Sequence, residues 1–302
     1  MRILIAGSSG LIGTALCRHL SAGGHEPVRL VRPGSRRPPT GGEHVTWDPR
    51  AGELPAEAID RADVVVNLAG AGIGDHRWTD SYRRELVESR LQSTDLLARA
   101  IAASPTPPQV FLSGSAVGWY GDRGDEQLDE TSGPGSGFLA DLCTRWEDAA
   151  APAGGAGTRV VLLRTGVVLS ADGGALAKQL PLFKFGLGGR FGSGRQWQSW
   201  ITLDDHVAAV EHLLTADVRG PVNLTAPEPA TNATFTSTLG RVLHRPAILR
   251  IPSFGPKLLL GSELVETVLL GGQRVLPRRL EESGFRFSEP RLEGALRAVL
   301  GR

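Results

Sequence analysis

The chain opens with a short apolar run, a cluster of glycines and then a helical repeat of apolar positions. Four consecutive apolar residues precede Gly7, and a short run bounded by glycine predicts a buried parallel strand. Apolar residues then recur every four positions from Ile12 to Leu20, which predicts one face of a helix. The glycine pair at residues 23–24 ends that helix, and residues 28–31 form the next apolar run. The first unit is therefore predicted as strand, glycine-rich turn, helix and strand.

Similar units follow along the first half of the chain. Apolar runs predict strands at residues 64–68, 110–113 and 160–168, and helical stretches fill residues 81–102 and 138–150. Strands that alternate with helices in this way form a parallel sheet with helices on both faces. The fold class is therefore predicted as α/β, with a Rossmann-type, doubly wound parallel sheet.

The pattern changes after about residue 170. A glycine-rich segment breaks the alternation, and a helix that starts near Asp204 and Asp205 and a further strand then restore it. Beyond residue 226, short helical stretches are punctuated by prolines. We therefore predict a nucleotide-binding domain and a smaller, mainly helical cap and C-terminal domain on the substrate side. The first comprises residues 1–170 with 201–225 returning to it, and the second comprises 171–200 and 226–302.

Composition bounds the class of protein. The chain has 302 residues, of which 41% are hydrophobic and 22% charged, as in folded globular proteins. The formal net charge of +1 and the lack of a long apolar run give no reason to expect nucleic acid or a membrane as a partner. The N-terminus lacks signal-peptide features, and Cys17 and Cys143 are predicted to be buried free thiols. A cytoplasmic location is predicted, and the oligomeric state stays open, with a homodimer as one alternative.

The glycines after the first strand predict a dinucleotide site. The run from Gly7 to Gly13 follows a strand and opens a helix, which is the setting in which such a motif is informative. Glycine lets the backbone approach a pyrophosphate, and a helix N-terminus offers free N–H groups and a positive dipole end. The alternative is a tight strand-to-helix turn without a ligand. The residues predicted to contact the cofactor here are Gly7, Ser9, Gly10, Leu11, Ile12 and Gly13.

The residue that ends the second strand selects the dinucleotide. A carboxylate at this point would bind a ribose 2′-hydroxyl, but the chain has Arg32, with Arg36 and Arg37 close behind. A guanidinium pairs with a 2′-phosphate, which a carboxylate would repel. The sequence therefore predicts NADP(H) as the cofactor in preference to NAD(H). The alternative is that these arginines belong to a solvated loop.

Two further strand ends face the expected cofactor. Asn67, Leu68, Ala69 and Gly70 end one strand, and small residues there would let the backbone approach the adenosine ribose. Ser113 and Ser115 end the next strand, near the expected nicotinamide. A hydroxyl at that point can bind a reacting carbonyl or alcohol. The alternatives are a turn role for Asn67 and a structural hydrogen bond for each serine.

At these residues the chain resembles the extended short-chain dehydrogenase/reductase superfamily. The stretch from Ser115 to Gly121 resembles its serine-rich strand end and Tyr-Gly pair, and Trp200 to Asp205 resembles its Phe-Ile-His-Val-Asp-Asp stretch. The closer resemblance is to an atypical branch called NAD-dependent epimerase/dehydratase-like, or "epimerase family protein", and it covers essentially the whole chain. The motifs of that branch stand in order at Arg77-Trp78, Ser89-Arg90 with Thr94, Phe138-Leu139 with Trp146-Glu147, residues 188–201, residues 271–277 and Gly284-Phe285.

The resemblance fails at the usual proton-transfer pair. Ordinary members carry Tyr-x-x-x-Lys on the helix after the Tyr-Gly pair, where this chain has Phe138 and Leu142. Both would face the cofactor, one helical turn apart, and neither can exchange a proton. Loss of a general acid or base removes about 10²- to 10⁴-fold in rate. Tyr120 is the first candidate for a replacement acid or orienting donor, and an aromatic wall of the pocket is its alternative role.

The cap is predicted to supply the substrate contacts. In the resembled superfamily a glycine-rich loop here often meets the diphosphate of a sugar nucleotide, and Arg190 and Arg195 would form an anion clamp. Surface charge on a flexible loop is the alternative. Gln196 and Trp200 are predicted to line the same pocket, and Trp78 either contacts the substrate or is a packing residue.

Two functions remain open at the level of sequence. One is an NADP(H)-dependent oxidoreductase or epimerase acting on an unknown small substrate, with an anionic compound or a sugar nucleotide as candidates. The other is a non-catalytic NADP(H)-binding sensor or regulatory protein, which the missing pair favours. The cap with its arginines favours the enzyme, and hydride transfer itself is the chemistry of the cofactor. No metal site is predicted.

Overall fold

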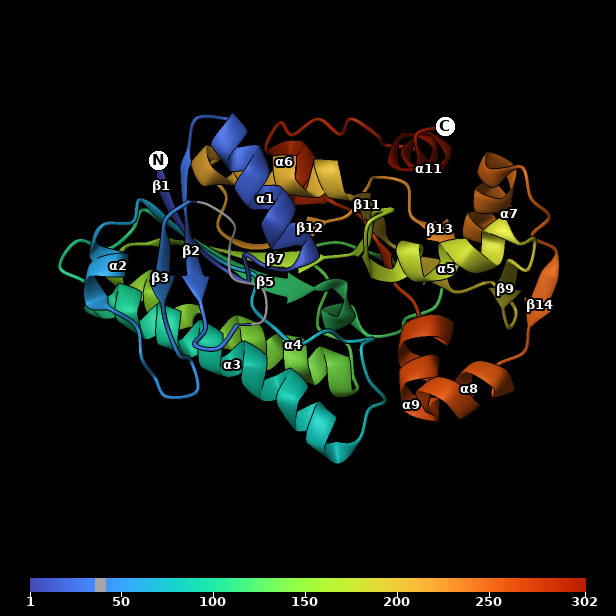
Figure 1. The fold of residues 1–302 in the computed structure, drawn as a ribbon, viewed down its shortest axis with the longest axis horizontal. Helices are drawn as coiled ribbons and strands as arrows, with labels where there is room; N and C mark the ends of the chain where they lie inside the picture. Colours follow the sequence, from blue (N-terminus) through green and yellow to red (C-terminus); the bar gives the residue numbers. More distant parts are fainter. Residues whose placement is uncertain (36–41) are drawn as a thin grey trace.

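A computed structural model describes residues 1–35 and 42–302. Its centre is a seven-stranded sheet in which every neighbouring pair is parallel, in the order β12-β7-β5-β4-β1-β2-β3 (Figure 1). The predicted α/β, doubly wound fold is therefore confirmed. The strands of this sheet are β1 (Arg2–Ala6), β2 (Glu26–Val31), β3 (His44–Thr46), β4 (Val64–Asn67), β5 (Val110–Ala116), β7 (Arg159–Thr165) and β12 (Gly220–Leu224).

Helices cover both faces of the sheet. In Figure 1, α1 and α6 lie above the sheet, and α3 and α4 lie below it. The sequence allows this because both faces of the strands are apolar: Ile3 and Ile5 of β1 belong to one core, and Leu4 belongs to the other. The flanking helices are α1 (Leu11–Ala22), α2 (Ala56–Asp60), α3 (Asp80–Ala103), α4 (Phe138–Asp148), the 3₁₀ helix η2 (Ala151–Ala156) and α6 (Leu203–Thr215).

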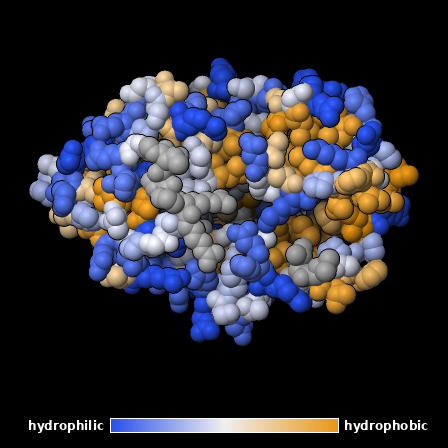
Figure 2. All heavy atoms as spheres, viewed as in Figure 1, coloured by the Kyte–Doolittle hydropathy of each residue, from blue (hydrophilic) through white to orange (hydrophobic). Residues whose placement is uncertain are grey.

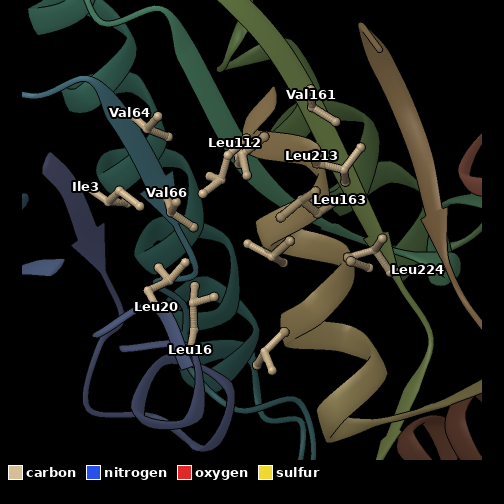
Figure 3. Packing of buried hydrophobic residues seen from close by; sticks show 14 of the residues in the cluster. Ile3, Leu16, Leu20, Val64, Val66, Leu112, Val161, Leu163, Leu213 and Leu224 are labelled. Carbon is tan, nitrogen blue, oxygen red and sulfur yellow. The ribbon is translucent and has the colours of Figure 1, made fainter. Parts of the chain in front are cut away.

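The first core holds the glycine turn in place. Leu16 and Leu20 of α1 pack against Ile3 and Val66, and Leu213 of α6 joins them (Figure 3). These side chains are almost completely excluded from solvent, and each fully buried leucine contributes about 1.5–3 kcal/mol to the free energy of folding. The N-terminus of α1 is therefore fixed at the carboxyl end of the sheet.

Most of the remaining segments form the cap, whereas α10 (Arg278–Glu282) packs against β12 of the main sheet. The cap has its own apolar core, in which Leu176, Phe183 and Leu239 are buried, and two small sheets in which β9 pairs with β14 and β10 with β13. The cap elements are α5 (Gly174–Lys184), β9 (Gly189–Phe191), β10 (Trp197–Gln198), β13 (Ala230–Thr231), α7 (Asn232–Leu243), β14 (Leu249–Ile251), α8 (Phe254–Leu260), α9 (Ser262–Leu264), the π-helix η3 (Val265–Leu270) and α11 (Leu292–Leu300). The predicted helical C-terminal part is thus present, and α6 and β12 lie with the main sheet between the two cap segments.

One local expectation was wrong. The predicted strand at residues 160–168 is broken at Gly166 into β7 and β8 (Val167–Leu169), and β8 pairs with β11 (Trp200–Thr202) outside the main sheet. A side chain at Gly166 would come within 2.4 Å of the Ser199 carbonyl oxygen, so the chain crosses too closely for a regular strand. The helix expected near Asp204 and Asp205 is α6, and both aspartates lie in its first turn, after the N-cap Thr202.

Three further expectations concern the thiols, membrane spans and metal sites of the described residues. Cys17 and Cys143 are free and buried, and burial raises the pKa of the Cys143 thiol to about 12. In residues 1–35 and 42–302, no helix is long and apolar enough to span a bilayer. The same residues contain no group of three His, Cys, Asp or Glu side chains placed to hold a metal ion.

Candidate dinucleotide site

The turn between β1 and α1 accepts only glycine at two positions. Gly7 has a φ of +77°, and a Cβ there would lie 2.6 Å from the carbonyl carbon of Leu68. A Cβ on Gly13 would lie 2.2 Å from the Gly7 oxygen. Real Cβ contacts are not this short, so α1, the turn and the end of β4 are packed backbone against backbone. This close packing leaves the outer side of the turn open.

The open side is the start of α1, at the wall of a pocket. Gly10 is the N-cap, so no side chain caps the helix, and its first turn contains no acidic residue. The amides there and the positive end of the helix dipole are thus available to an anion. The pocket has a volume of about 500 Å³ and lies among the ends of β1, β2 and β4. Its lining includes the predicted cofactor residues Gly7, Ser9, Gly10, Arg32, Leu68, Ala69 and Gly70.

Three guanidinium groups belong to the far wall of this pocket. Arg32 follows β2 and is exposed, and Arg29 of β2 and Arg50 line the same space. Arg50 also forms an ion pair with Glu85 of α3, with Nη2 and Oε2 2.7 Å apart. The predicted Arg36 and Arg37 lie outside the described residues. The adenosine side of the pocket thus has a cationic wall at the place where an NAD-binding protein would need a carboxylate.

The end of β4 is held by a buried amide. Asn67 is fully buried; its Oδ1 accepts from the Ala69 amide, and its Nδ2 donates to the Thr94 hydroxyl over 2.9 Å. The indole of Trp146 donates to the same Thr94 oxygen. Asn67 therefore shapes the turn that brings Leu68, Ala69 and Gly70 to the pocket, and its own side chain does not line the pocket.

Three of the predicted cofactor residues, Leu11, Ile12 and Gly13, do not line the pocket. Gly13 is buried against the turn. The side chain of Leu11 points to the cap, since a Cβ on Gly173 would lie 3.2 Å from its Cδ1. Direct contact of these three residues with a cofactor stays a prediction.

The two serines at the end of β5 differ in their bonding. Ser113 is fully buried, and its hydroxyl has no hydrogen-bond partner among the described residues. Ser115 donates to Oε1 of Glu147 over 2.6 Å. A buried hydroxyl without a partner is uncommon in folded proteins and indicates a group that a ligand or water completes. Ser113 is therefore the freer of the two for a bound molecule.

Tyr120 lies inside the protein and not at a pocket wall. Its ring is fully buried, and its hydroxyl donates to Oδ1 of Asn223 over 2.8 Å and accepts from Nη1 of Arg164 over 3.1 Å. Burial raises the pKa of this hydroxyl. A fully buried phenol with two partners favours a structural role over both the catalytic role and the aromatic wall.

Phe138 and Leu142, which the resemblance puts at the positions of the usual catalytic pair, have packing roles in the structure. The Phe138 ring meets Trp78 edge-on at 5.3 Å, and the Arg83 guanidinium lies 4.4 Å from its centroid. Leu142 is almost fully buried. Neither residue lines the 500 Å³ pocket, and neither can exchange a proton at this position.

The predicted substrate residues do not form one cluster. Trp200 is fully buried, and its Nε1 donates to the Glu228 carbonyl. The Gln196 amide donates to the carbonyls of Phe191 and Leu269, so it ties the glycine-rich loop to η3. Arg195 is exposed and Arg190 is half-buried. Of these predicted residues, only the two arginines therefore have a charged head that makes no hydrogen bond or ion pair in the described structure.

Trp78 also packs within the protein. Its Nε1 donates to the Ile73 carbonyl over 2.9 Å, and the indole is half-buried against Phe138. The loop that carries it meets the cap, because Nζ of Lys178 on α5 donates to the Gly74 carbonyl and approaches Asp75 within 3.3 Å. Lys178 thus joins the cap to the loop that precedes α3.

Sequence reasoning missed two parts of the site. Arg50 was not considered because it follows β3, a short strand with exposed residues that no apolar run predicted. The pair of Glu147 and Arg164 was missed because the partners are 17 positions apart on different elements. The motif position of Glu147 was the only signal, and it did not indicate a partner.

The residues present fit a phosphorylated dinucleotide. A glycine turn that backbone contacts keep free of side chains, an uncapped helix N-terminus and a cationic wall meet in one pocket. The fold and this turn define a nucleotide-binding protein of the extended short-chain dehydrogenase/reductase type. The chain belongs to the NAD dependent epimerase/dehydratase family, whose model matches residues 3–225. Residues 251–299 match a domain of unknown function, DUF1731.

Known proteins resemble the chain over its whole length. Epimerase family protein ML0860 of Mycobacterium leprae is 44% identical over 295 residues, which are 97% of this chain and 94% of that protein. The crystal structure of human epimerase family protein SDR39U1 (isoform 2) with NADPH is 39% identical, has a TM-score of 0.90, and the match covers 100% of this chain and 99% of that one. A nucleoside-diphosphate sugar epimerase from Corynebacterium glutamicum is 38% identical with a TM-score of 0.78, over 100% of this chain and 58% of that chain.

Proposed function

We propose that this chain is an NADP(H)-binding oxidoreductase or epimerase-like enzyme that acts on a small substrate without the Tyr-x-x-x-Lys pair. The observation that carries the proposal is the pocket at the start of α1, where a glycine turn faces Arg32 and Arg50 and no carboxylate ends β2. The NADPH bound by the human relative supports the choice of dinucleotide.

Different residues of this chain would bind different parts of the cofactor. The turn from Gly7 to Gly10 would hold the pyrophosphate through backbone amides, and Arg32 and Arg50 would bind the 2′-phosphate. The bound nicotinamide would supply hydride chemistry, as it does in this class of enzyme. Ser113, with its free hydroxyl, would orient a substrate oxygen at the end of β5.

Proton transfer would depend on Ser115 and Glu147. These two are 2.6 Å apart, which is the hydrogen-bond distance that a relay of one proton requires. Arg164 donates two hydrogen bonds of 2.8 Å to the same carboxylate, one to Oε1, which also accepts from Ser115, and one to Oε2. The arrangement offers a hydroxyl and a carboxylate in contact, in place of the usual tyrosine and lysine.

A small anionic substrate fits the cap. Arg190 and Arg195 stand on the glycine-rich stretch of the cap and have free charged heads in the described structure. The name of the Corynebacterium glutamicum protein, a nucleoside-diphosphate sugar epimerase, makes a sugar nucleotide the first class to assay. A clamp of two guanidiniums would bind its diphosphate.

A second function has an observation in its favour. Phe138 and Leu142 are apolar and packed, and Tyr120 is buried with both sides of its hydroxyl occupied. A protein that binds NADP(H) and responds to it without turnover needs no proton donor. The non-catalytic sensor is therefore the alternative that the test must exclude.

The test measures binding and turnover separately. NADPH and NADH are titrated against the purified full-length chain, and the chain is then incubated with NADP⁺ or NADPH and a panel of sugar nucleotides. Tighter binding of NADPH and a product that is lost in Ser115→Ala are expected. Tighter binding of NADH would refute the cofactor proposal, and binding of NADPH without turnover of any substrate would favour the sensor.

The role of Tyr120 is decided by one variant. Tyr120→Phe removes the hydroxyl that bonds Asn223 and Arg164 and leaves the ring in place. We expect turnover to persist and the melting temperature to fall, since a structural hydrogen bond has been lost. Loss of turnover at an unchanged melting temperature would restore Tyr120 as a catalytic residue.

A further inference from the structure

The outer edge of the cap exposes an unusual set of large apolar side chains. Of the ten large hydrophobic residues that are exposed in the described part of the chain, seven lie on three neighbouring segments of the cap. Figure 2 shows apolar residues gathered on this side of the molecule, over the region of β14 and α8 in Figure 1. We call this surface the apolar edge; its residues are Leu182, Phe185, Leu187, Ile248, Leu249, Phe254 and Leu258.

The segments of the apolar edge are joined by direct contacts. A Cβ on Gly186 would lie 3.3 Å from Cγ of Pro246, and Nε of Arg245 donates to the Lys184 carbonyl over 3.0 Å. The pairing of β9 with β14 continues this contact, and α8 follows β14 within three residues. The end of α5, the strand β14 and the helix α8 therefore form one continuous surface.

Most of the area of four side chains on this surface is exposed to solvent. Ile248 is 87% exposed, Phe185 81%, Leu258 77% and Phe254 73%. Single exposed hydrophobic residues are normal, but a contiguous group marks a site where the protein meets another apolar phase. A surface of this kind is typical of a site that contacts another molecule or a membrane.

The segments that build the apolar edge carry basic residues but no acidic ones. Residues 173–203 and 229–262 contain no aspartate or glutamate, although the whole chain has 32 acidic and 33 basic side chains. The two stretches carry eight lysines and arginines, at positions 178, 184, 190, 195, 241, 245, 250 and 257. The net charge of the whole chain hides this local excess, which is why composition gave no reason to expect a membrane.

The nearest carboxylates are neutralised by partners. Glu266 accepts from Nζ of Lys257 over 2.6 Å, and Glu263 pairs with Arg83 across 3.2 Å. Lys184 and Arg250, by contrast, are exposed, and neither forms an ion pair within the described residues. Lys178, Arg241 and Lys257 are ion-paired, so Lys184 and Arg250 form the basic rim that faces solvent without a counterion in the described structure.

We propose that the apolar edge inserts into the surface of a membrane that contains anionic lipid. Phe185, Ile248, Phe254 and Leu258 would enter the boundary between headgroups and acyl chains, while Lys184 and Arg250 would meet the lipid phosphates. A second copy of the chain fits less well, because a self-complementary contact would bring two basic rims together. The protein would bind peripherally through the cap, and the dinucleotide pocket, whose lining residues all lie between residues 7 and 93, would stay outside the inserted surface.

The test uses vesicles and the full-length chain. Sedimentation is measured with vesicles of phosphatidylcholine alone and with vesicles that contain phosphatidylglycerol as well. Binding to the second kind only is expected, and it should weaken as salt is added. The triple variant Phe185→Ser, Ile248→Ser, Phe254→Ser should bind at least tenfold more weakly, because each removed side chain loses its burial in lipid.

A charge-matched control isolates the basic rim. Lys184→Gln with Arg250→Gln should weaken binding about tenfold, whereas Arg18→Gln with Arg99→Gln, two exposed cations of the main domain, should not. An unchanged melting temperature and unchanged NADPH binding show that each variant is folded. Failure of the unaltered protein to bind anionic vesicles would overturn the proposal. A dimer in solution that the triple variant dissociates would overturn it too, and would identify a second copy as the occupant.

Discussion

Glu147 of α4 and Arg164 of β7 form a bidentate ion pair inside the protein, with Nε–Oε1 and Nη2–Oε2 distances of 2.8 Å. Their side chains are 9% and 3% exposed, so both charges are removed from water. The Arg164 guanidinium also lies 3.4 Å from the centroid of the Trp119 ring. The pair fixes α4 to the sheet and gives Ser115 its acceptor.

The first prediction concerns this pair. Glu147→Gln should lower the free energy of unfolding by about 3–5 kcal/mol, because it leaves the buried Arg164 charge without a counterion. Denaturant unfolding measures the change. Asp95→Asn, which breaks an exposed ion pair with Arg99, is the control and should change stability little. Equal losses in the two variants would contradict a special role for burial.

The second prediction concerns the choice of dinucleotide. Arg32→Ala and Arg50→Ala should each weaken NADPH binding by roughly 10- to 100-fold, the equivalent of one charge-assisted hydrogen bond. NADH binding should not change, since it has no 2′-phosphate. The dissociation constants of both cofactors are measured by titration. Arg99→Ala, an exposed arginine at the other end of α3, is the control, and a parallel loss of NADH affinity would mean that the pocket itself was damaged.

The third prediction separates two glycines of the turn. Gly13→Ala should lower the free energy of unfolding by at least about 2 kcal/mol, because its Cβ would lie 2.2 Å from the Gly7 oxygen. At Gly10 the same atom would be 3.4 Å away, and the residue is exposed at the pocket wall. Gly10→Ala should therefore keep its melting temperature and lose NADPH affinity. If Gly10→Ala binds NADPH normally, the pyrophosphate does not lie at this turn.

The fourth prediction concerns acid stability. Complete burial lowers the pKa of His206 to about 4 from its usual value of 6.5. A lowered pKa in the folded state stabilises the protein above pH 6.5, and this contribution is lost as the pH falls from 6.5 towards 4. The loss should amount to about 3 kcal/mol, and His206→Gln should remove that part of the slope. Unfolding is measured across this range, with the exposed His76→Gln as control; identical slopes for the unaltered protein and His206→Gln would refute the assignment.

The sequence predicts the sheet and the glycine turn well because both depend on local patterns. The apolar run before Gly7 and the helical repeat after it define β1 and α1 without any distant partner. The edge strand β3 was missed because its residues are exposed and do not form an apolar run. Local pattern therefore suffices where an element is buried on both faces and fails at the edge of the sheet.

From the sequence, the site could be predicted only where the backbone itself forms it, as at the glycine turn. Tyr120 was a candidate substrate residue because it is the tyrosine that follows β5, the strand that ends near the expected nicotinamide. Its partner Asn223 is 103 positions away, so no spacing indicates that the hydroxyl is already bonded. Trp200 was predicted to line the substrate pocket, but it is fully buried and its indole donates to the Glu228 carbonyl, 28 positions further on. Side chains whose bonding partners are distant in sequence take roles that only the fold reveals.

The path of the chain between the main sheet and the cap limits how this protein can be divided. The chain leaves the sheet after β7, builds α5 and β9, returns for α6 and β12, and then leaves again. The pairing of β9 with β14 joins the first excursion to the second. A cut at the start of the DUF1731 region would therefore fall at the end of β14 and would separate α11 from α7, on which it packs. Gene fusion or shuffling in this family would have to carry both excursions together.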